Sequence, residues 1–229
     1  MKKGIFTVYN PHVARCMTLM NIKWFHTGLP TRESIESPYK FIPIIPDESK
    51  MTTSILSSIR KSSDTIIGFT NPEMQMSPEY CANVWQIIQN TKLLIGSPCF
   101  SDYIWMNQFM ALVRSRKLKV DFTCAQWYGL DKTVKGSLRE LKMGCLKTFM
   151  EYDKPVWLTR FACNPKMTRE NKLNFIQSAV DLLDSLPYVH RYAWDNLTQG
   201  TNALVDSMGY PNDLGLAYAG TEGFNTQEP

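Results

Sequence analysis

The chain has 229 residues, of which 44% are hydrophobic and 20% are charged, enough apolar sequence to bury the core of a folded domain. Its formal net charge is only +4 and no run of Lys or Arg exceeds two residues, so we expect no nucleic-acid partner. No apolar stretch is long enough to cross a membrane, and Asn10 and Pro11 end the first apolar segment too early for a secretory signal. We therefore expect an intracellular protein without a membrane partner, in the cytoplasm or nucleus of a host cell if the source is a virus.

The spacing of cysteine and histidine excludes the common metal and redox sites. The six cysteines are scattered and form no CxxC pair, which excludes zinc-ribbon and thioredoxin-like patterns. Several of them lie in apolar segments, where free buried thiols are the usual state. The three histidines are far apart in the chain. The sequence therefore predicts no metal site and no cofactor.

Short apolar runs rich in β-branched residues alternate with helical patterns along most of the chain, and such runs predict buried strands. Eight strands are predicted, at residues 4–10, 21–28, 41–47, the start of 64–73, 92–98, 120–129, 155–163 and 189–195.

Most connections between these strands carry apolar residues spaced three or four apart, as amphipathic helices do. Ser77 followed by Pro78 predicts a helix start, because serine caps a helix and proline suits its first turn. Thr168 is a second cap of this kind. The remaining helices are predicted around 51–59, 105–112 and 138–149, with a short closing helix at 212–219.

Eight strands joined mostly by helices predict a single (β/α)8 TIM barrel that spans residues 1–229. Right-handed crossovers make the strands of such a barrel parallel, so that their carboxyl ends share one face. An open doubly wound sheet is the structural alternative. It is disfavoured because no glycine-rich phosphate-binding loop follows any predicted strand.

The segment 64–73 organises the prediction of a site. It begins as an apolar strand and ends in the polar residues Thr70, Asn71 and Glu73, with Pro72 preventing further strand pairing. A buried strand that carries polar side chains at its carboxyl end is how a parallel α/β sheet presents an active site.

Several strand ends together resemble one family, the glycosyl hydrolase catalytic-core proteins of glycoside hydrolase family 128, which cut β-1,3-glucans. The matching stretches are GFTNPE at 68–73, VDF at 120–122 with QWYG at 126–129, PVWLTRF at 155–161, YN at 9–10 and RYAW at 191–194. The resemblance implies a compact barrel and a sugar-binding cleft at the carboxyl ends of the strands.

The differences from that family fall on its chemistry. The resemblance places Asn71 where the family has its proton-donating glutamate, Arg160 where it has its nucleophilic glutamate, and Gln126 where it has a histidine. A retaining glycosidase needs two carboxyl groups about 5–5.5 Å apart. Loss of both implies loss of hydrolysis, so the three residues mark a vestigial site and the chain is expected not to be an enzyme.

An arginine in a barrel mouth needs a counter-charge, because an unpaired buried cation is costly. Glu73 is the first candidate for that counter-charge and Asp195 the second. A rebuilt active site that uses these carboxylates is the alternative interpretation.

The same strand ends supply candidates for ligand binding. Aromatic rings stack on the apolar faces of sugars, but they also form much of a barrel's core, and both interpretations stay open. The candidate ligand-binding residues are Tyr9, Asn10, Trp24, Glu73, Trp127, Tyr128 and Trp194.

Three functional hypotheses follow from the sequence. The first is an inactive barrel retained as a structural or self-assembling protein, for example in a storage or viral occlusion-body matrix, with copies of itself as partners. The second is a pseudoenzyme that binds a β-glucan oligosaccharide. The third is an active endo-β-1,3-glucanase with relocated carboxylates.

Overall fold

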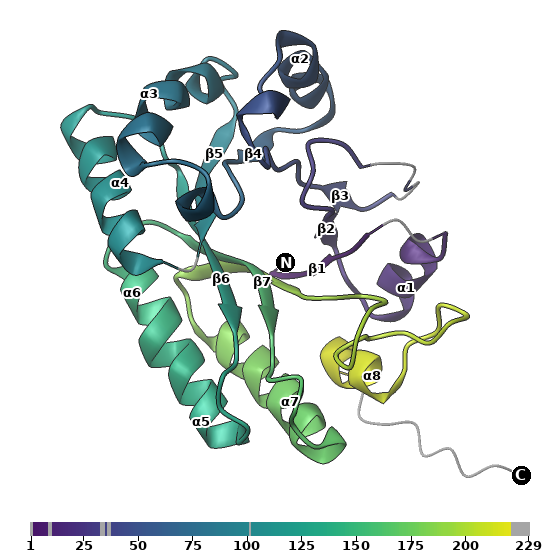
Figure 1. Cartoon of the computed structure of the whole chain (residues 1–229). Helices are drawn as coiled ribbons and strands as arrows, with labels where there is room; N and C mark the ends of the chain where they lie inside the picture. The colour runs from purple at the N-terminus through teal and green to yellow at the C-terminus, as the bar shows by residue number, and fades with distance from the viewer. Residues whose placement is uncertain (1, 9–10, 33–34, 36–37, 101, 221–229) are drawn as a thin grey trace, which may run out of the picture.

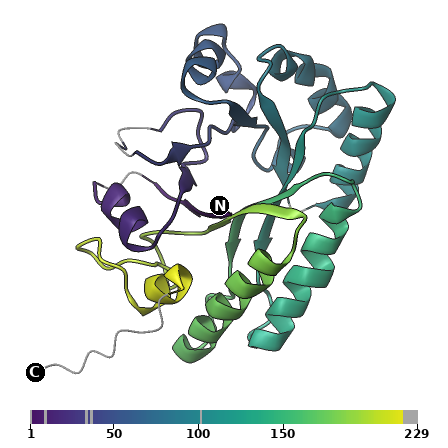
Figure 2. The same ribbon diagram turned by 180° about the vertical axis from the view of Figure 1, so that it is seen from behind.

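A computed structural model describes residues 2–8, 11–32, 35, 38–100 and 102–220. Within this part of the chain, eight parallel strands form one curled sheet in the order β3-β2-β1-β8-β7-β6-β5-β4, with the helices on its outside (Figure 1). The strands are β1 (Lys3–Phe6), β2 (Trp24–His26), β3 (Lys40–Phe41), β4 (Thr65–Ile67), β5 (Leu94–Phe100), β6 (Phe122–Tyr128), β7 (Val156–Ala162) and β8 (Val189–Trp194). The view from behind shows the same arrangement (Figure 2).

The segments that carry β3 and β4 meet through backbone contacts that close the barrel. The N–H of Ile45 donates to the carbonyl oxygen of Ile67 over 3.1 Å, and the N–H of Ile67 donates to that of Pro43 over 3.0 Å. The third predicted strand is reduced to two residues, because proline at position 43 has no N–H to give to a ladder. The predicted (β/α)8 barrel is confirmed.

The helices cover the outer face of the sheet (Figure 1). They are α1 (Val13–Leu19), α2 (Thr53–Ser62), α3 (Pro78–Gln89), α4 (Tyr103–Ser115), α5 (Val134–Arg139), α6 (Lys147–Met150), α7 (Arg169–Ser185) and α8 (Asp213–Ala219), with a π-helical segment at Glu140–Leu146 and 3-10 turns at Glu48–Lys50 and Pro72–Met74. The side chains of Ser77 and Thr168 accept hydrogen bonds at the starts of α3 and α7, as predicted. None of the helices in the described part of the chain has the length and apolarity needed to cross a membrane.

The pattern-based prediction contains no helix between the first two strands, yet α1 lies there. Its buried residues Val13, Cys16 and Met17, together with Met20 just beyond its end, follow the spacing of one helical face. The signal is therefore present but covers only two turns, and His12 at the N-cap gives no side-chain capping bond that would mark the start.

The core has two parts because successive strand residues face opposite sides of the sheet. Residues of one set fill the inside of the barrel, and residues of the other set pack against the helices. The inner cluster contains Trp24, Ile42, Ile44, Ile67, Cys99, Phe122, Cys124, Trp157 and Ala193. At the amino-terminal end of the barrel, the guanidinium of Arg191 lies over the rings of Trp24 and Trp157, at 5.6 and 4.6 Å from their centroids.

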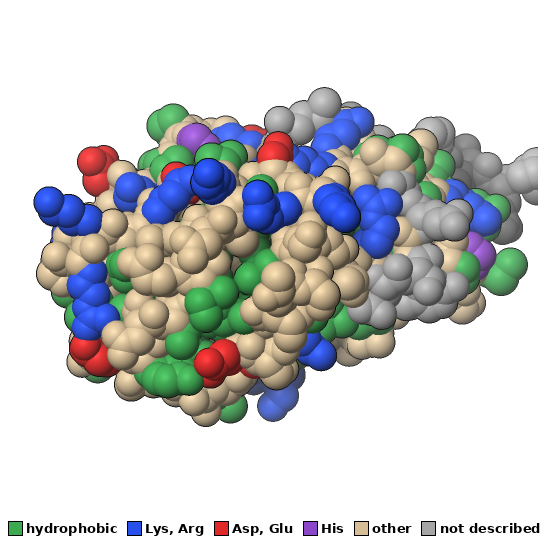
Figure 3. All heavy atoms as spheres, turned by 90° about the horizontal axis from the view of Figure 1, so that it is seen from above, with side chains coloured by type: hydrophobic (Ala, Val, Ile, Leu, Met, Phe, Trp, Pro, Cys, Tyr) green, Lys and Arg blue, Asp and Glu red, His purple; other side chains and the backbone are tan. Residues whose placement is uncertain are grey.

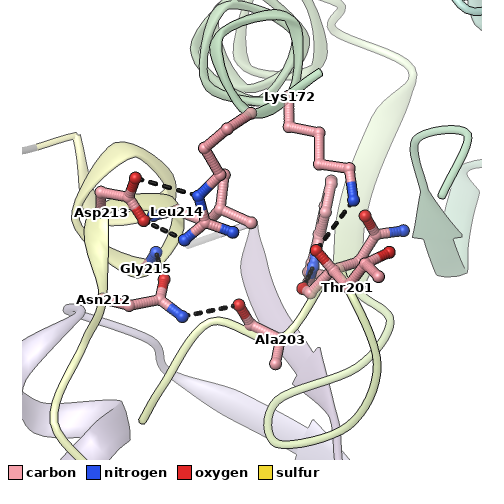
Figure 4. Close-up of polar contacts among 10 residues, drawn as sticks. Lys172, Thr201, Ala203, Asn212, Asp213, Leu214 and Gly215 are labelled. Carbon is pink, nitrogen blue, oxygen red and sulfur yellow. Dashed lines mark hydrogen bonds and ion pairs between the residues drawn. The ribbon is translucent and has the colours of Figure 1, made fainter. Parts of the chain in front are cut away.

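The segment that follows β8 is held against α7 by polar contacts (Figure 4). The Nζ of Lys172 donates to the carbonyl oxygen of Thr201 over 2.9 Å, and Arg169 forms an ion pair with Asp213. The predicted closing helix at 212–219 is α8, which begins at Asp213; Asn212 is its N-cap, and the Asn212 amide also donates to the backbone carbonyl of Ala203. These contacts place α8 beside α7.

Inside the barrel, Gly4 provides space for the indole of Trp24. A Cβ at Gly4 would lie 2.1 Å from a ring carbon of Trp24. We predict that Gly4→Ala lowers the free energy of unfolding by about 1–3 kcal/mol, because overpacking forces the ring or the backbone to move. Gly144→Ala is the control, since a Cβ there meets no atom within 4 Å. Urea unfolding measures both, and equal losses of stability would contradict this description of the barrel interior.

Candidate functional site

Arg160, on β7, forms the central ion pair at the carboxyl end of the sheet. Its Nε and Nη2 atoms donate to Oδ2 of Asp195 over 3.0 and 2.8 Å. Asp195 directly follows β8, the strand next to β7, and its N–H donates to the carbonyl oxygen of Phe161 over 2.9 Å. That backbone bond fixes the carboxylate beside the arginine. The side chain of Asp195 is only 10% exposed and that of Arg160 is 26% exposed, so much of the pair is removed from water.

Tyr128, the last residue of β6, completes this cluster from the other side of β7. Its hydroxyl donates to the same Oδ2 atom of Asp195 over 2.5 Å. Burial raises the pKa of Tyr128, the charge of Asp195 raises it further, and the charge of Arg160 opposes this. The phenol therefore stays protonated at neutral pH and acts as a donor. Because Oδ2 accepts three hydrogen bonds, Asp195 serves as an acceptor in this arrangement.

Two residues from the first two strands support the ion pair. The guanidinium carbon of Arg160 lies 3.9 Å from the centroid of the Phe6 ring, a close cation–π contact. His26 is fully buried, and its Nε2 lies 2.7 Å from the carbonyl oxygen of Thr159. A carbonyl only accepts, so Nε2 carries the proton, and Nδ1 is a buried acceptor that has no hydrogen-bond partner among the described residues.

The charge state of His26 follows from its surroundings. Burial lowers the pKa of His26 to about 3, and the positive charge of Arg160 lowers it as well, although the hydrogen bond to Thr159 acts in the opposite direction. His26 is thus neutral near pH 7 and does not compete with Arg160 for Asp195.

The other two positions predicted to mark a vestigial site lie at the same end of the sheet as Arg160. Asn71 follows β4 in a left-handed conformation with φ of 46°, and its N–H donates to the carbonyl oxygen of Cys99 over 2.8 Å. Gln126 is buried on β6 and is the register partner of Arg160 on β7. The structure therefore brings Gln126 directly beside Arg160, and Asn71 stands at the end of a strand farther along the sheet.

The partner of Arg160 is the second of the two carboxylates considered from the sequence. Glu73, the first candidate, is half-buried in the 3-10 turn after β4. The expectation that Glu73 supplies the counter-charge is corrected by the ion pair with Asp195. The reason is strand order, because β8 is adjacent to β7 whereas β4 is separated from it by β5 and β6.

Three of the aromatic candidates lie in the core, where the packing alternative placed them. Trp24 is inside the amino-terminal half of the barrel, and its Nε1 donates to the carbonyl oxygen of Lys2 over 2.9 Å. Trp127 stacks on Phe175 of α7 with ring centroids 5.7 Å apart. Trp194 is fully buried between the sheet and the helices.

Tyr128 is the aromatic candidate that solvent reaches, with 45% of its surface exposed. Tyr9 and Asn10 lie outside the described residues. Phe6 and His26 were not predicted from the sequence, but both contribute to the site from the first two strands. A lone histidine within an otherwise apolar strand was the signal for His26.

A comparison with protein families matches residues 8–218 to the model described as "Glycosyl hydrolase catalytic core". Among curated proteins, the chain is similar to Alkali-sensitive linkage protein 1 of Schizosaccharomyces pombe, with 24% identity over 224 residues. The match covers 86% of this chain and 40% of that protein, so the chain spans less than half the length of this relative.

Among solved structures, the chain is similar to a GH128 subgroup I endo-β-1,3-glucanase from Amycolatopsis mediterranei, with 25% identity and a TM-score of 0.90 over 97% of this chain and 100% of that one. Another structure of that enzyme, with a TM-score of 0.88, contains laminaripentaose. A GH128 subgroup III curdlan-specific exo-β-1,3-glucanase from Blastomyces gilchristii, in complex with glucose, matches at 22% identity with a TM-score of 0.78 over 95% of this chain and 97% of that one. The last likeness concerns the fold alone.

The ion pair gives a prediction about stability. Arg160→Ala should lower the free energy of unfolding by about 2–3 kcal/mol, because it leaves the buried carboxylate of Asp195 without its cation; a fully buried pair would lose ~3–5 kcal/mol. Arg169→Ala is the matched control, because Arg169 and Asp213 are both about half exposed, and exposed pairs contribute about 0–1 kcal/mol. Chemical denaturation compares the two variants. A similar small loss for both would show that the Arg160 pair is no more important than a surface pair.

The buried neutral histidine gives a prediction about pH. An unfolded histidine has a pKa near 6.5, above the value of about 3 in the folded protein. Below about pH 6.5 the unfolded chain binds the proton and the folded chain does not, so stability falls as the pH falls toward 3 and is unaffected above 6.5. Between about pH 7.5 and about pH 4.5, His26 should account for roughly 1–3 kcal/mol of lost stability.

His26→Gln tests this, because the amide can still donate to Thr159 but does not titrate. The variant should lose less stability than the parent over the same pH interval, when both are unfolded with urea at each pH. His190→Gln, at an exposed position on β8, is the control and should behave like the parent. An unchanged pH dependence in His26→Gln would contradict the assignment of a neutral buried histidine.

Proposed function

Since the chain belongs to the glycosyl hydrolase catalytic core family, whose model spans residues 8–218, we propose that it binds a β-1,3-glucan oligosaccharide at the carboxyl end of the barrel without hydrolysing it. The observation that carries this proposal is the ion pair of Arg160 with Asp195 at the position where the family has its nucleophile. A guanidinium there can bind a sugar hydroxyl, but it cannot attack an anomeric carbon.

The residues at the two positions that are catalytic in the family cannot perform hydrolysis. Retaining hydrolysis needs a carboxylic acid that donates and takes back a proton, and a carboxylate about 5–5.5 Å away that attacks the sugar. Asn71 has an amide at the first position and Arg160 a permanent cation at the second. Asp195 lies beside the second position, but its Oδ2 accepts three hydrogen bonds and is held there. A nucleophile must leave such contacts in order to attack.

The site retains polar groups that can bind a sugar. Within the described residues, Nη1 of Arg160 and Oδ1 of Asp195 make no hydrogen bond with the protein. One is a donor and the other an acceptor, a combination that suits the adjacent hydroxyl groups of a neutral sugar. The exposed ring of Tyr128 adds a face for stacking next to them. The Amycolatopsis enzyme binds laminaritriose and laminaripentaose in solved structures, which supports the choice of ligand.

The other two hypotheses from the sequence are a structural role and an active enzyme. The structural or self-assembling role stays a prediction, because a single chain offers no contact between copies. The active-enzyme hypothesis requires Glu73 to act as the catalytic acid. Glu73 is half-buried in the turn after β4, and the experiment below tests whether it has this role.

Laminaripentaose provides the test. We expect calorimetry to show binding to the purified chain and chromatography of the same mixture to show no shorter products. Tyr128→Ala should weaken binding about tenfold, because loss of one stacked ring costs about 1–1.5 kcal/mol. Tyr188→Ala, at the opposite end of the sheet just before β8, should bind like the parent.

Each contrary outcome has a defined meaning. Release of shorter glucans that stops in Glu73→Gln would show an active glucanase with relocated carboxylates. Absence of binding at millimolar laminaripentaose would reject the pseudoenzyme proposal and leave a structural role as the remaining hypothesis.

A further inference from the structure

A second candidate site lies away from the carboxyl ends of the strands. A surface cavity of about 630 Å³ opens where β3 and β4 begin, next to the last turn of α2. Its charged lining consists of Arg32, Lys40, Arg60, Lys61 and Asp64. These residues come from three separate segments of the chain, which the parallel sheet brings together because all strands begin at the same end.

The acid in this lining is already neutralised. The Nζ of Lys40 lies 2.7 Å from Oδ1 of Asp64, and the hydroxyl of Thr65 donates to the same carboxylate over 2.6 Å. Lys40, and after it Thr65, hold the pKa of Asp64 below its usual value. The charge of Asp64 also acts on Arg191, where it opposes the lowering of the arginine pKa by burial. Asp64 is therefore no available counter-charge for the other cations of the cavity.

Arg60 and Lys61 supply the excess positive charge. Both are exposed, and neither forms an ion pair within the described part of the chain. Figure 3 shows that Lys and Arg side chains gather along one edge of the face that is seen from above, where acidic side chains are few. Basic residues in the last turn of a helix interact favourably with its macrodipole, which alone would explain their position on α2. The dipole does not explain the cavity beside them or the convergence of Arg32 and Lys40 from the segment before β3.

The remaining lining suits the organic part of a small ligand. Tyr39 is half-buried and its hydroxyl lies 2.8 Å from that of Thr18, which fixes the ring at the edge of the cavity. Phe41 and Leu93 add apolar surface, and Ser62 and Ser63 add hydroxyl groups. The volume falls within the range of about 300–1,000 Å³ that is typical of small-molecule sites.

We propose that this cavity binds a small molecule that carries a phosphate or diphosphate group, with Arg60 and Lys61 on the anion and Tyr39 against its organic part. The planar guanidinium of an arginine matches two phosphate oxygens at once, and lysine adds a point charge. This site is independent of the glucan site, because it lies at the opposite end of the strands. The sequence contains no run of charged residues that would predict this site, because its cations are separated by up to about thirty positions.

The test uses the whole chain with inorganic pyrophosphate and ATP as probes at physiological ionic strength. We expect both to raise the melting temperature in a saturable way, and ATP to bind more tightly because it also contacts Tyr39. The double variant Arg60→Glu, Lys61→Glu should weaken binding of both probes at least tenfold. Lys142→Glu, Lys147→Glu is the matched control, with the same change of charge at exposed positions between α5 and α7. It should bind like the parent.

Four results would overturn the proposal. One is the absence of saturable binding of either probe at millimolar concentration. The second is equal stabilisation by sulfate at the same ionic strength, which would show general anion screening. The third is equal loss of binding in both double variants, which would show that net charge and not the cavity is responsible. The fourth is tight binding of a nucleic-acid oligomer with no response to ATP, which would show that the ligand is a polyanion and not a small molecule. Laminaripentaose binding, measured in the same variants, reports separately on the glucan site.

Discussion

The ion pair between Arg160 and Asp195 determines what the carboxyl end of this barrel can do. Placing a guanidinium at the end of a buried strand is costly unless a carboxylate meets it. Asp195 does so with two hydrogen bonds, Tyr128 donates a third to the same oxygen, and the ring of Phe6 faces the cation. His26 adds no charge beneath the pair because burial keeps it neutral. The charges of this cluster therefore satisfy one another, which is the basis of the proposal that the site binds a sugar without hydrolysing it.

A parallel barrel tolerates changes of the polar residues at its strand ends without loss of the fold. Its backbone hydrogen bonds and two-part core do not depend on the polar side chains at the strand ends. Gln126 and Arg160, two positions at which the resemblance predicts a change of residue type, are register partners on β6 and β7. Fold and chemistry can be separated in such a scaffold, because function resides in a few residues placed on it. The same geometry that brings the strand ends together at the proposed glucan site brings the strand beginnings together at the basic cavity.

The sequence predicts the periodic features of this protein well and the spatial ones poorly. The alternation of apolar runs and helical patterns was enough for the barrel, and the caps Ser77 and Thr168 mark helix starts correctly. Helix α1 was missed because two turns give little periodicity. The choice of Glu73 over Asp195 failed because proximity depends on which strands are neighbours, and linear order does not give this.

The aromatic residues illustrate the same limit. Trp127 and Tyr128 are adjacent in the sequence, yet alternation along β6 buries the first against Phe175 and exposes the second beside Asp195. A tryptophan suits both a sugar-binding cleft and an apolar core, so the sequence does not distinguish the two roles for Trp24 and Trp194. The structure shows that both are fully buried in the core. The cations of the basic cavity were invisible for the related reason that they come together only in the folded chain.

A crystal structure of the protein grown with laminaripentaose tests the central claim most directly. We predict an uncut oligosaccharide along the carboxyl ends of the strands, with a sugar ring on Tyr128 and sugar hydroxyls on Nη1 of Arg160 and Oδ1 of Asp195. The ion pair between these two side chains should remain intact beneath the ligand. Density for cleaved products, or an Arg160 side chain that has left Asp195 so that the carboxylate faces an anomeric carbon, would contradict it.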